Sequence, residues 1–322
     1  MDTLSQVLQA VELSGAVFLS AEFTAPWCVL SEADSKICRA YLPKADRVLS
    51  YHLISEGRCL ARLADGSNQA LSLEAGDLIV VPQGEAHLLG SDMAMIPVPS
   101  APLMEEHVKS NPGEILRLSH GAGGPATRMV CGFLTCDGIL GNPLLQSLPR
   151  IFKVSVGGGA ESAWLATALA FAATEAAAPR PGGATVLGKL SELLFVHAVR
   201  RCLDALPAHE TGWLAALRDR YVGPAMLRLH ADPGYPWTVD RLAGEVGLSR
   251  SAFAQRFTGL LGQPPMQYLA RWRLRAAARE LRSGNRPLAE LAGTVGYESE
   301  AAFSRAFKRE FGMPPASWRT SR

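Results

Sequence analysis

The sequence lacks several features that would assign it quickly to a class of proteins. Its 322 residues include six cysteines, none of them in a CxxC pair, so neither a zinc finger nor a disulfide framework is indicated. No apolar run approaches the ~18 residues of a membrane span, and the N-terminal segment has no basic region and no cleavage site. Charged residues make up 19% of the chain and hydrophobic residues 48%, which excludes a disordered protein. We therefore expect a cytoplasmic, globular protein of about two domains with no membrane partner.

The net charge of +2 conceals two parts of opposite sign. From Asp232 onward the chain has 14 Lys and Arg against 8 Asp and Glu, whereas the preceding part has 18 against 22. A basic C-terminal part on an acidic body favours contact with a polyanion. Because basic faces are often only solvated, the charge alone does not indicate binding to a polyanion, and a binding motif is needed as well.

One sequence element occurs twice near the C-terminus. Its first copy is "VGLSRSAFAQRFTGLLG", from Val246 to Gly262, and its second is "VGYESEAAFSRAFKREFG", from Val295 to Gly312. Each copy has a Gly turn, a Ser suited to cap a helix, and phenylalanines four residues apart. That spacing puts the rings on one buried stripe of the helix. Helix, short turn with Gly, helix is the helix-turn-helix plan, whose second helix enters the major groove of DNA.

The polar positions of the second helix in each copy are candidates for DNA contact, because the phenylalanine stripe must face inward. Arg and Gln pair with guanine and adenine edges, whereas Ser and Lys more often hold phosphates. The alternative is an ordinary helical bundle with a solvated polar face. The candidates are Arg250, Ser251, Gln255 and Thr258 in the first copy, and Glu300, Ser304, Arg305 and Lys308 in the second.

The stretch between the two copies, from Pro265 to Gly284, predicts one long helix rich in Ala, Leu and Arg. A helix of this length separates the two recognition helices by roughly 30 Å. This is close to one turn of B-DNA, so the two copies are placed to read adjacent major grooves on one face of a duplex.

The last ninety residues resemble the DNA-binding domain of the AraC/XylS family of bacterial transcription regulators. The pieces that carry the resemblance are "WTVDRLAGEVGLSRSAFAQRF", "YLARWRLRAAARELR" and "LAGTVGYESEAAFSRAFKREFGMPPASWR". The resemblance implies binding to double-stranded promoter DNA, contact with RNA polymerase, and regulation by a variable N-terminal domain. It leaves activation and repression open.

The N-terminal part predicts short strands separated by Gly turns. Gly76, Pro82, Gly84 and His87 match the second cupin motif, whereas the first motif is incomplete because Ser50 stands where a His is usual. The region therefore resembles a degenerate cupin jelly roll, and the whole chain resembles the cupin-bearing AraC-type regulators. By contrast, the Pro- and Gly-rich stretch from Ser91 to Ala126 is expected to be an irregular insertion.

These patterns together predict a two-domain α+β protein. Residues 1–155 are expected to form a cupin-like β-barrel (jelly roll) that senses an effector. Residues 156–230 are expected to form a helical linker, which by family resemblance mediates homodimerisation. Residues 231–322 are expected to form the all-α DNA-binding domain with two helix-turn-helix units.

The interior of the barrel offers candidate metal ligands. Cupin enzymes bind a metal through His and carboxylate side chains, and here His52, Glu56 and His87 are expected to converge, with Cys131 adding a thiolate; His52, His87 and Cys131 are the candidate ligands. Two His and one Cys suit zinc better than a redox iron site. The alternative is that the two histidines are structural residues or contacts for an organic effector.

A thiol switch is the other interpretation of this domain. Cys28, Cys38, Cys131 and Cys136 lie in the expected sensor, so an oxidant is a candidate effector. Cys131 and Cys136 are five residues apart, so on a regular strand they point to opposite faces and cannot bond to each other. An enzyme with an appended DNA-binding domain is the alternative function. It requires a complete set of metal ligands, and Ser50 counts against it, so we predict no catalytic residues.

Overall fold

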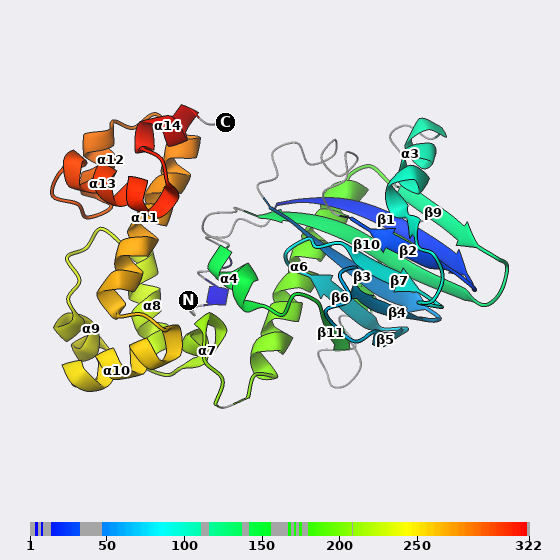
Figure 1. Cartoon of the computed structure of the whole chain (residues 1–322), viewed down its shortest axis with the longest axis horizontal. Coiled ribbons are helices and arrows are strands. Elements are labelled where there is room, and N and C mark those ends of the chain that lie inside the picture. Colours follow the sequence, from blue (N-terminus) through cyan, green and yellow to red (C-terminus); the bar gives the residue numbers. More distant parts are fainter. Residues whose placement is uncertain are drawn as a thin grey trace. The chain divides into compact units, whose positions relative to one another are not determined.

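The computed structural model describes residues 4–5, 8, 14–32, 47–110, 116–136, 142–155, 167–168, 171, 174–175, 180–207 and 209–320 (Figure 1). The chain divides into two compact units. The first, here called the sheet unit, comprises Leu13–Asp137 and Leu148–Asp204. The second, the helical unit, comprises Ala205–Arg322 together with Met1–Glu12 and Gly138–Ser147.

The sheet unit contains two β-sheets (Figure 1). The six-stranded sheet has the order β11 (Phe152–Ser155), β6 (Asp77–Val81), β3 (Arg47–Glu56), β10 (Ala126–Cys136), β1 (Ser14–Thr24) and β9 (Leu116–Gly121). The five-stranded sheet has the order β5 (Leu71–Glu74), β4 (Arg58–Leu63), β7 (His87–Gly90), β2 (Cys28–Ser31) and β8 (Val98–Pro99). The prediction of a sheet-rich N-terminal domain followed by a helical one is confirmed. Closure of the sheets into a barrel stays a prediction.

The inner faces of the two sheets share one hydrophobic core. Strand β4 alternates, with Cys59, Ala61 and Leu63 buried and the residues between them more exposed, as expected for a strand with one covered face. The same core contains Ile54 and Cys131 from the six-stranded sheet. A polar side chain that points inward from either sheet must therefore fit into this space between the sheets.

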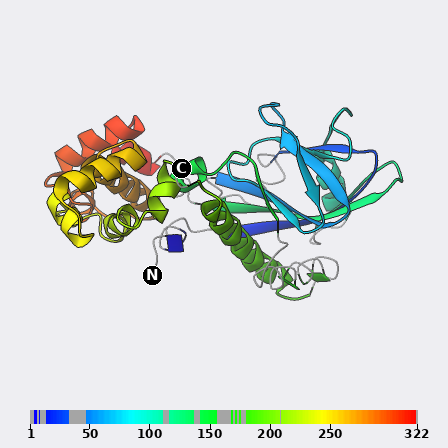
Figure 2. The same cartoon turned by 90° about the horizontal axis from the view of Figure 1, so that it is seen from below.

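The opposite face of the six-stranded sheet is covered by α6 (Gly183–Asp204), the green helix that runs along the sheet in Figure 2. This explains why every residue of β6 is buried, since both of its faces are covered. On β3 the side chains alternate accordingly. Tyr51 reaches the hydroxyl of Ser191 on α6 by a hydrogen bond, whereas its neighbour His52 points between the sheets to His87.

The prediction that the stretch from Ser91 to Ala126 is irregular is wrong. It contains strand β8, helix α3 (Ser100–Ser110) and strand β9. Helix α3 follows directly after Pro99, in a segment whose Ala, Leu, Met, Glu and Lys residues favour helix. Strand β9 pairs with β1 in parallel, which requires a crossover connection rather than a hairpin turn, and so leaves no local turn signal in the sequence.

The helical unit consists of short helices around one long one. They are α4 (Asn142–Ser147), α7 (Trp213–Arg218), α8 (Val222–Ala231), α9 (Val239–Glu245), α10 (Arg250–Leu261), α11 (Pro265–Ser283), α12 (Leu288–Thr294), α13 (Glu300–Phe311) and α14 (Pro315–Thr320). The long helix predicted between the two copies is present as α11. The segment predicted as a linker runs through both units, because α6 packs on the sheets while α7 and α8 pack against α10. None of the helices in the described part of the chain has the length and apolar character needed to cross a bilayer.

Candidate DNA-binding surface and interior histidine pair

Two matching helix-turn-helix units are present, α9–α10 and α12–α13. Ser249 and Ser299 cap α10 and α13 by accepting from the amides of Ala252 at 3.3 Å and Ala302 at 3.2 Å. Both helices end at a glycine in the left-handed conformation, Gly262 at φ 68° and Gly312 at φ 78°. Four of the rings predicted to face inward are fully buried, namely Phe253, Phe257, Phe303 and Phe307, whereas Phe311 at the end of the second stripe is half-buried. The orientation of both second helices is therefore fixed, and their polar sides face outward.

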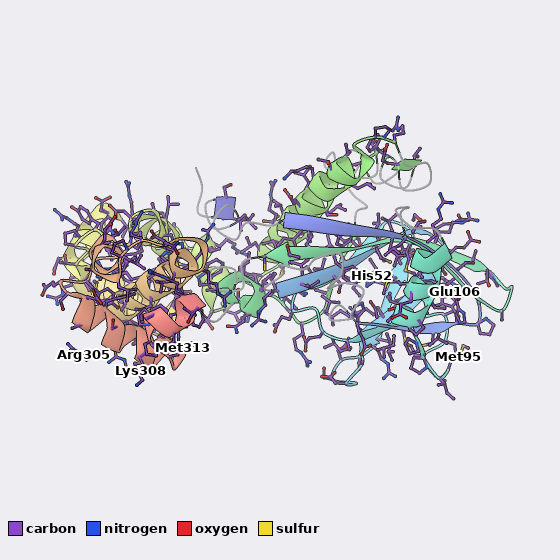
Figure 3. The ribbon with its side chains drawn as sticks, turned by 90° about the horizontal axis from the view of Figure 1, so that it is seen from above. His52, Met95, Glu106, Arg305, Lys308 and Met313 are labelled. Atoms are coloured by element: carbon purple, nitrogen blue, oxygen red, sulfur yellow. The ribbon has the colours of Figure 1, made fainter. Side chains whose placement is uncertain are left out.

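The predicted DNA-contacting residues lie on these outward sides. Arg250, Ser251, Gln255, Glu300, Arg305 and Lys308 are exposed, and Thr258 and Ser304 are half-buried. Arg305 and Lys308 are directed away from α13, as Figure 3 shows. Within the described part of the chain, the side chains of Gln255, Arg305 and Lys308 make no hydrogen bond or ion pair, so they are available to a ligand.

Other polar side chains on α10 already have partners. Arg250 lies 3.7 Å from Asp240, but both side chains are about 70% exposed, so this ion pair is weak. Arg256, by contrast, donates to the Oδ2 atom of Asp219, in the turn between α7 and α8, through both Nε, at 2.8 Å, and Nη2. Asp219 also accepts from two main-chain amides, and its pKa is lowered by these bonds against the opposing effect of its burial. Arg256 therefore fastens α10 to α8, and the candidates for reading bases are the unpaired side chains.

Substituting the unpaired side chains should separate base reading from phosphate contact. We expect Arg305→Ala and Gln255→Ala to weaken specific binding by about 1–3 kcal/mol each, because a bidentate contact to a base edge is worth that much discrimination. Dissociation constants for a selected duplex and a random duplex at one salt concentration measure it. Equal losses on both duplexes would assign the side chain to the phosphates instead.

The structure brings His52 of β3 and His87 of β7 together across the interior of the sheet unit, with His52 labelled in Figure 3. Their Nε2 atoms are 2.7 Å apart, and both residues are buried. The Nδ1 atom of His87 lies 2.8 Å from the carbonyl oxygen of Glu85, to which it must donate. Neutral His87 is therefore left with an acceptor at Nε2, so that His52 donates from its own Nε2. This leaves the Nδ1 atom of His52 as an acceptor.

That acceptor has no hydrogen-bond partner in the described structure, and neither has the hydroxyl of Ser50 two residues earlier on the same strand. Both atoms are buried. Burial lowers the pKa of His87 to about 4 and that of His52 well below its usual value, so both are neutral at pH 7. Sequence reasoning treated Ser50 only as the position of a missing metal ligand. Its unpartnered hydroxyl inside the core was not predictable, because no pattern along the chain reports hydrogen-bond satisfaction.

The third predicted metal ligand, Cys131, faces the same interior. It lies directly across from His52 in the pairing of β10 with β3, so the two side chains leave the same face of the sheet. Even so, the described residues include no group of three or more His, Cys, Asp or Glu side chains placed to hold a metal ion. Burial also raises the pKa of the Cys131 thiol, which opposes the thiolate form that zinc requires.

The other predicted redox cysteines differ in their surroundings. Cys28, Cys131 and Cys136 are buried and free of disulfides, and Cys38 lies outside the described residues. Burial raises the pKa of Cys28, although the nearby charge of Arg62 opposes this effect. Cys59, which the sequence did not single out, is also buried, and burial raises its pKa to about 12. Thiols with raised pKa values react slowly with oxidants, so thiol switching stays a prediction.

Known proteins resemble this chain over nearly its whole length. The Cupin family profile matches residues 2–204, and the Helix-turn-helix domain profile matches residues 242–321. A putative AraC-like transcription regulator of Streptomyces antibioticus is 31% identical over 322 residues, covering 99% of this chain and 98% of that protein. The HTH-type transcriptional regulator AlkR of Acinetobacter baylyi is 29% identical over 325 residues, covering 99% of each. The crystal structure of the DNA-binding domain of AdpA in complex with a target DNA is 30% identical over 32% of this chain and 92% of that chain, with a TM-score of 0.30.

Proposed function

The chain belongs to the AraC-like transcription regulators and is a DNA-binding regulator of transcription, and from that premise we propose that its sheet unit senses an effector that controls promoter binding. The two helix-turn-helix units supply the DNA contacts. The interior of the sheet unit contains buried polar atoms that have no hydrogen-bond partner in the described structure.

The proposal that the sheet unit senses an effector rests on one observation, the two polar atoms between the sheets that have no hydrogen-bond partner. A buried polar atom without a partner costs about 1–3 kcal/mol. The Nδ1 atom of His52 and the hydroxyl of Ser50 are two such atoms on one face of β3. An organic effector with one hydrogen-bond donor for His52 and one polar atom for Ser50 satisfies both and recovers that cost.

A cavity in the same unit supports an organic effector. It has a volume of about 850 Å³, within the range of small-molecule sites. Arg58 and Glu74 line it with opposite charges, and the buried thiol of Cys59 forms part of its wall. Cys59 is also close enough to Cys131 to raise the pKa of that thiol further. Ser50, His52 and His87 are not among the residues that line this cavity, so an effector that reaches them from it has to pass the core residues Cys59 and Cys131.

Zinc held by His52, His87 and Cys131 is the second candidate for what the interior holds. The histidine nitrogens converge, but they are already hydrogen-bonded to each other, and the third ligand is a protonated thiol. The conformation described here therefore fits a zinc ion poorly. An oxidant acting on the buried thiols is a third candidate, with the same obstacle of thiol protonation.

We further propose that α6 mediates homodimerisation. Val186 and Leu193 are 42% and 48% exposed and lie seven residues apart, which puts two apolar side chains on one outward side of the helix.

RNA polymerase is the partner that promoter regulation requires. We propose no enzymatic role, because a serine occupies the position of the first cupin histidine.

Native mass spectrometry of the untagged full chain tests the sensing proposal. We expect an organic adduct on the wild-type protein that is absent from His52→Leu, because that variant loses the acceptor at Nδ1. An adduct of about one zinc per chain, lost in His87→Ala, would instead favour the metal. If neither adduct forms, and His52→Leu binds DNA and controls a reporter promoter as the wild type does, the sheet unit has no sensing role.

A further inference from the structure

Helix α11 belongs to both helix-turn-helix units at once. Its first half contributes Tyr268, whose ring lies 5.6 Å from that of Phe257 in α10. Its second half contributes Leu274, Ala277, Ala278 and Leu281 to the core around Phe303 and Phe307. Arg273 lies at the middle of the helix, between these two sets of contacts. The relative orientation of the two units therefore depends on what holds this middle section.

The guanidinium of Arg273 joins main-chain segments from both units. It donates from Nε to the carbonyl oxygen of Pro233 at 2.6 Å and from Nη2 to that of Tyr235 at 2.9 Å. Its third donor, Nη1, reaches the carbonyl oxygen of Gly296 at 3.2 Å. Pro233 and Tyr235 precede the first unit, whereas Gly296 is the turn glycine of the second. One half-buried side chain thus connects the entry to the first unit with the turn of the second.

The segment from Asp232 to Trp237 is itself fixed to the first unit. The indole of Trp237 donates to the carbonyl oxygen of Asp232 at 2.9 Å, and the carboxylate of Asp232 accepts from the amide of Tyr235 at 3.1 Å. The guanidinium of Arg241, on α9, lies 5.0 Å from the ring centre of Tyr235. Displacing this segment therefore disturbs contacts of the first unit.

The same segment also abuts the second unit directly. A Cβ atom added at Gly234 would lie 2.2 Å from the carbonyl oxygen of Thr294 at the end of α12. A Cβ atom added at Gly296, which has a φ of +83°, would lie 2.7 Å from the guanidinium carbon of Arg273. The junction of the two units is therefore closely packed main chain on both sides of the Arg273 side chain.

We propose that Arg273 is a positioning residue that holds the two helix-turn-helix units at one separation and rotation, and so sets the spacing between the two DNA segments that the protein accepts. One inserted base pair moves the second segment by about 3.4 Å along the duplex and rotates it by roughly 34°. A rigid pair of units cannot follow that displacement, whereas a loosened pair can. Lysine at this position keeps the charge but lacks the planar fork that reaches three carbonyl oxygens.

The test uses the full chain and a duplex selected by the wild-type protein from a random library. Base pairs are inserted between the two protected segments, and dissociation constants are measured by fluorescence anisotropy at one salt concentration. We expect one inserted base pair to weaken wild-type binding by about tenfold or more, which corresponds to about 1.4 kcal/mol. For Arg273→Lys we expect the two spacings to differ by less than about threefold, with binding to a duplex carrying one segment unchanged.

Two further variants make the outcome decisive. Arg282→Lys, on the same helix, changes a guanidinium that lies over the Trp318 ring within the second unit, and should keep the wild-type spacing preference. Gly234→Ala opens the junction from the other side and should relax the preference as Arg273→Lys does, even if Arg273→Lys fails to fold. A uniform loss of affinity at all spacings, or a preserved preference in both junction variants, would overturn the proposal and leave Arg273 a purely structural residue.

Discussion

Replacing Phe303 by alanine should unfold the second helix-turn-helix unit, at a cost of about 3–5 kcal/mol. The Phe303 side chain is completely buried, with ring centres of Tyr297 and Phe307 at 5.6 Å and 5.5 Å. Phe307 in turn packs against Trp318 at 5.8 Å. The core of this small unit is built around these rings, so the cavity left by alanine removes a large part of what holds α13 on α11.

Urea denaturation followed by circular dichroism, with the fluorescence of the full chain recorded in parallel, measures this loss. Lys308→Ala is the matched control, because it shortens an exposed side chain on the same helix and should leave the midpoint unchanged. Phe253→Ala makes the equivalent change in the first unit, where the ring is also fully buried. Wild-type melting of Phe303→Ala would contradict the assignment of the buried stripe, and with it the outward placement of Arg305.

The helical unit was predictable because its determinants are local. A capping Ser, a Gly turn and phenylalanines four residues apart determine each second helix within about a dozen residues, and the duplication gives each copy the support of the other. The hydrogen bonds by which Arg273 joins the two helix-turn-helix units were not predictable. Arg273 is one of several arginines on α11, and its partners lie 23 to 40 residues away along the chain. Nothing in the pattern around Arg273 distinguishes it from its neighbours.

The sheet unit was less predictable because its pairing is not local. The cupin-like spacing predicted that His52, Glu56 and His87 converge. The hydrogen bond between the two histidines, 35 residues apart, confirms this for them, but it is wrong for Glu56, which is exposed and bonded to Arg128. The parallel pairing of β1 with β9 has no such signal, since the two strands are about a hundred residues apart. The tautomers of the histidine pair depend on the carbonyl oxygen of Glu85, a main-chain atom whose position only the folded chain defines.

Acid should destabilise the sheet unit through the histidine pair. In the fold, the Nε2 atom of His87 accepts from His52, so a proton added there would place two N–H groups against each other. Burial accordingly lowers the pKa of His87 from 6.5 to about 4, and that of His52 also falls. Both side chains bind protons more readily when unfolded. The stability they contribute is therefore complete above about pH 6.5 and is lost as the pH falls towards 4.

For His87 alone this shift corresponds to about 3 kcal/mol, since one pKa unit is worth about 1.4 kcal/mol. The free energy of unfolding is measured in urea at pH 7 and at pH 4.5 for the wild type and for the double variant His52→Leu, His87→Leu. Because the buried His230 of the helical unit, whose pKa burial lowers to about 3, is present in both proteins, its contribution cancels in the comparison. We expect the double variant to lose less stability in acid than the wild type. The full wild-type loss in the double variant would mean that the fold does not lower the pKa values of the pair, and would contradict the buried, unpartnered acceptor at His52 on which the sensing proposal depends.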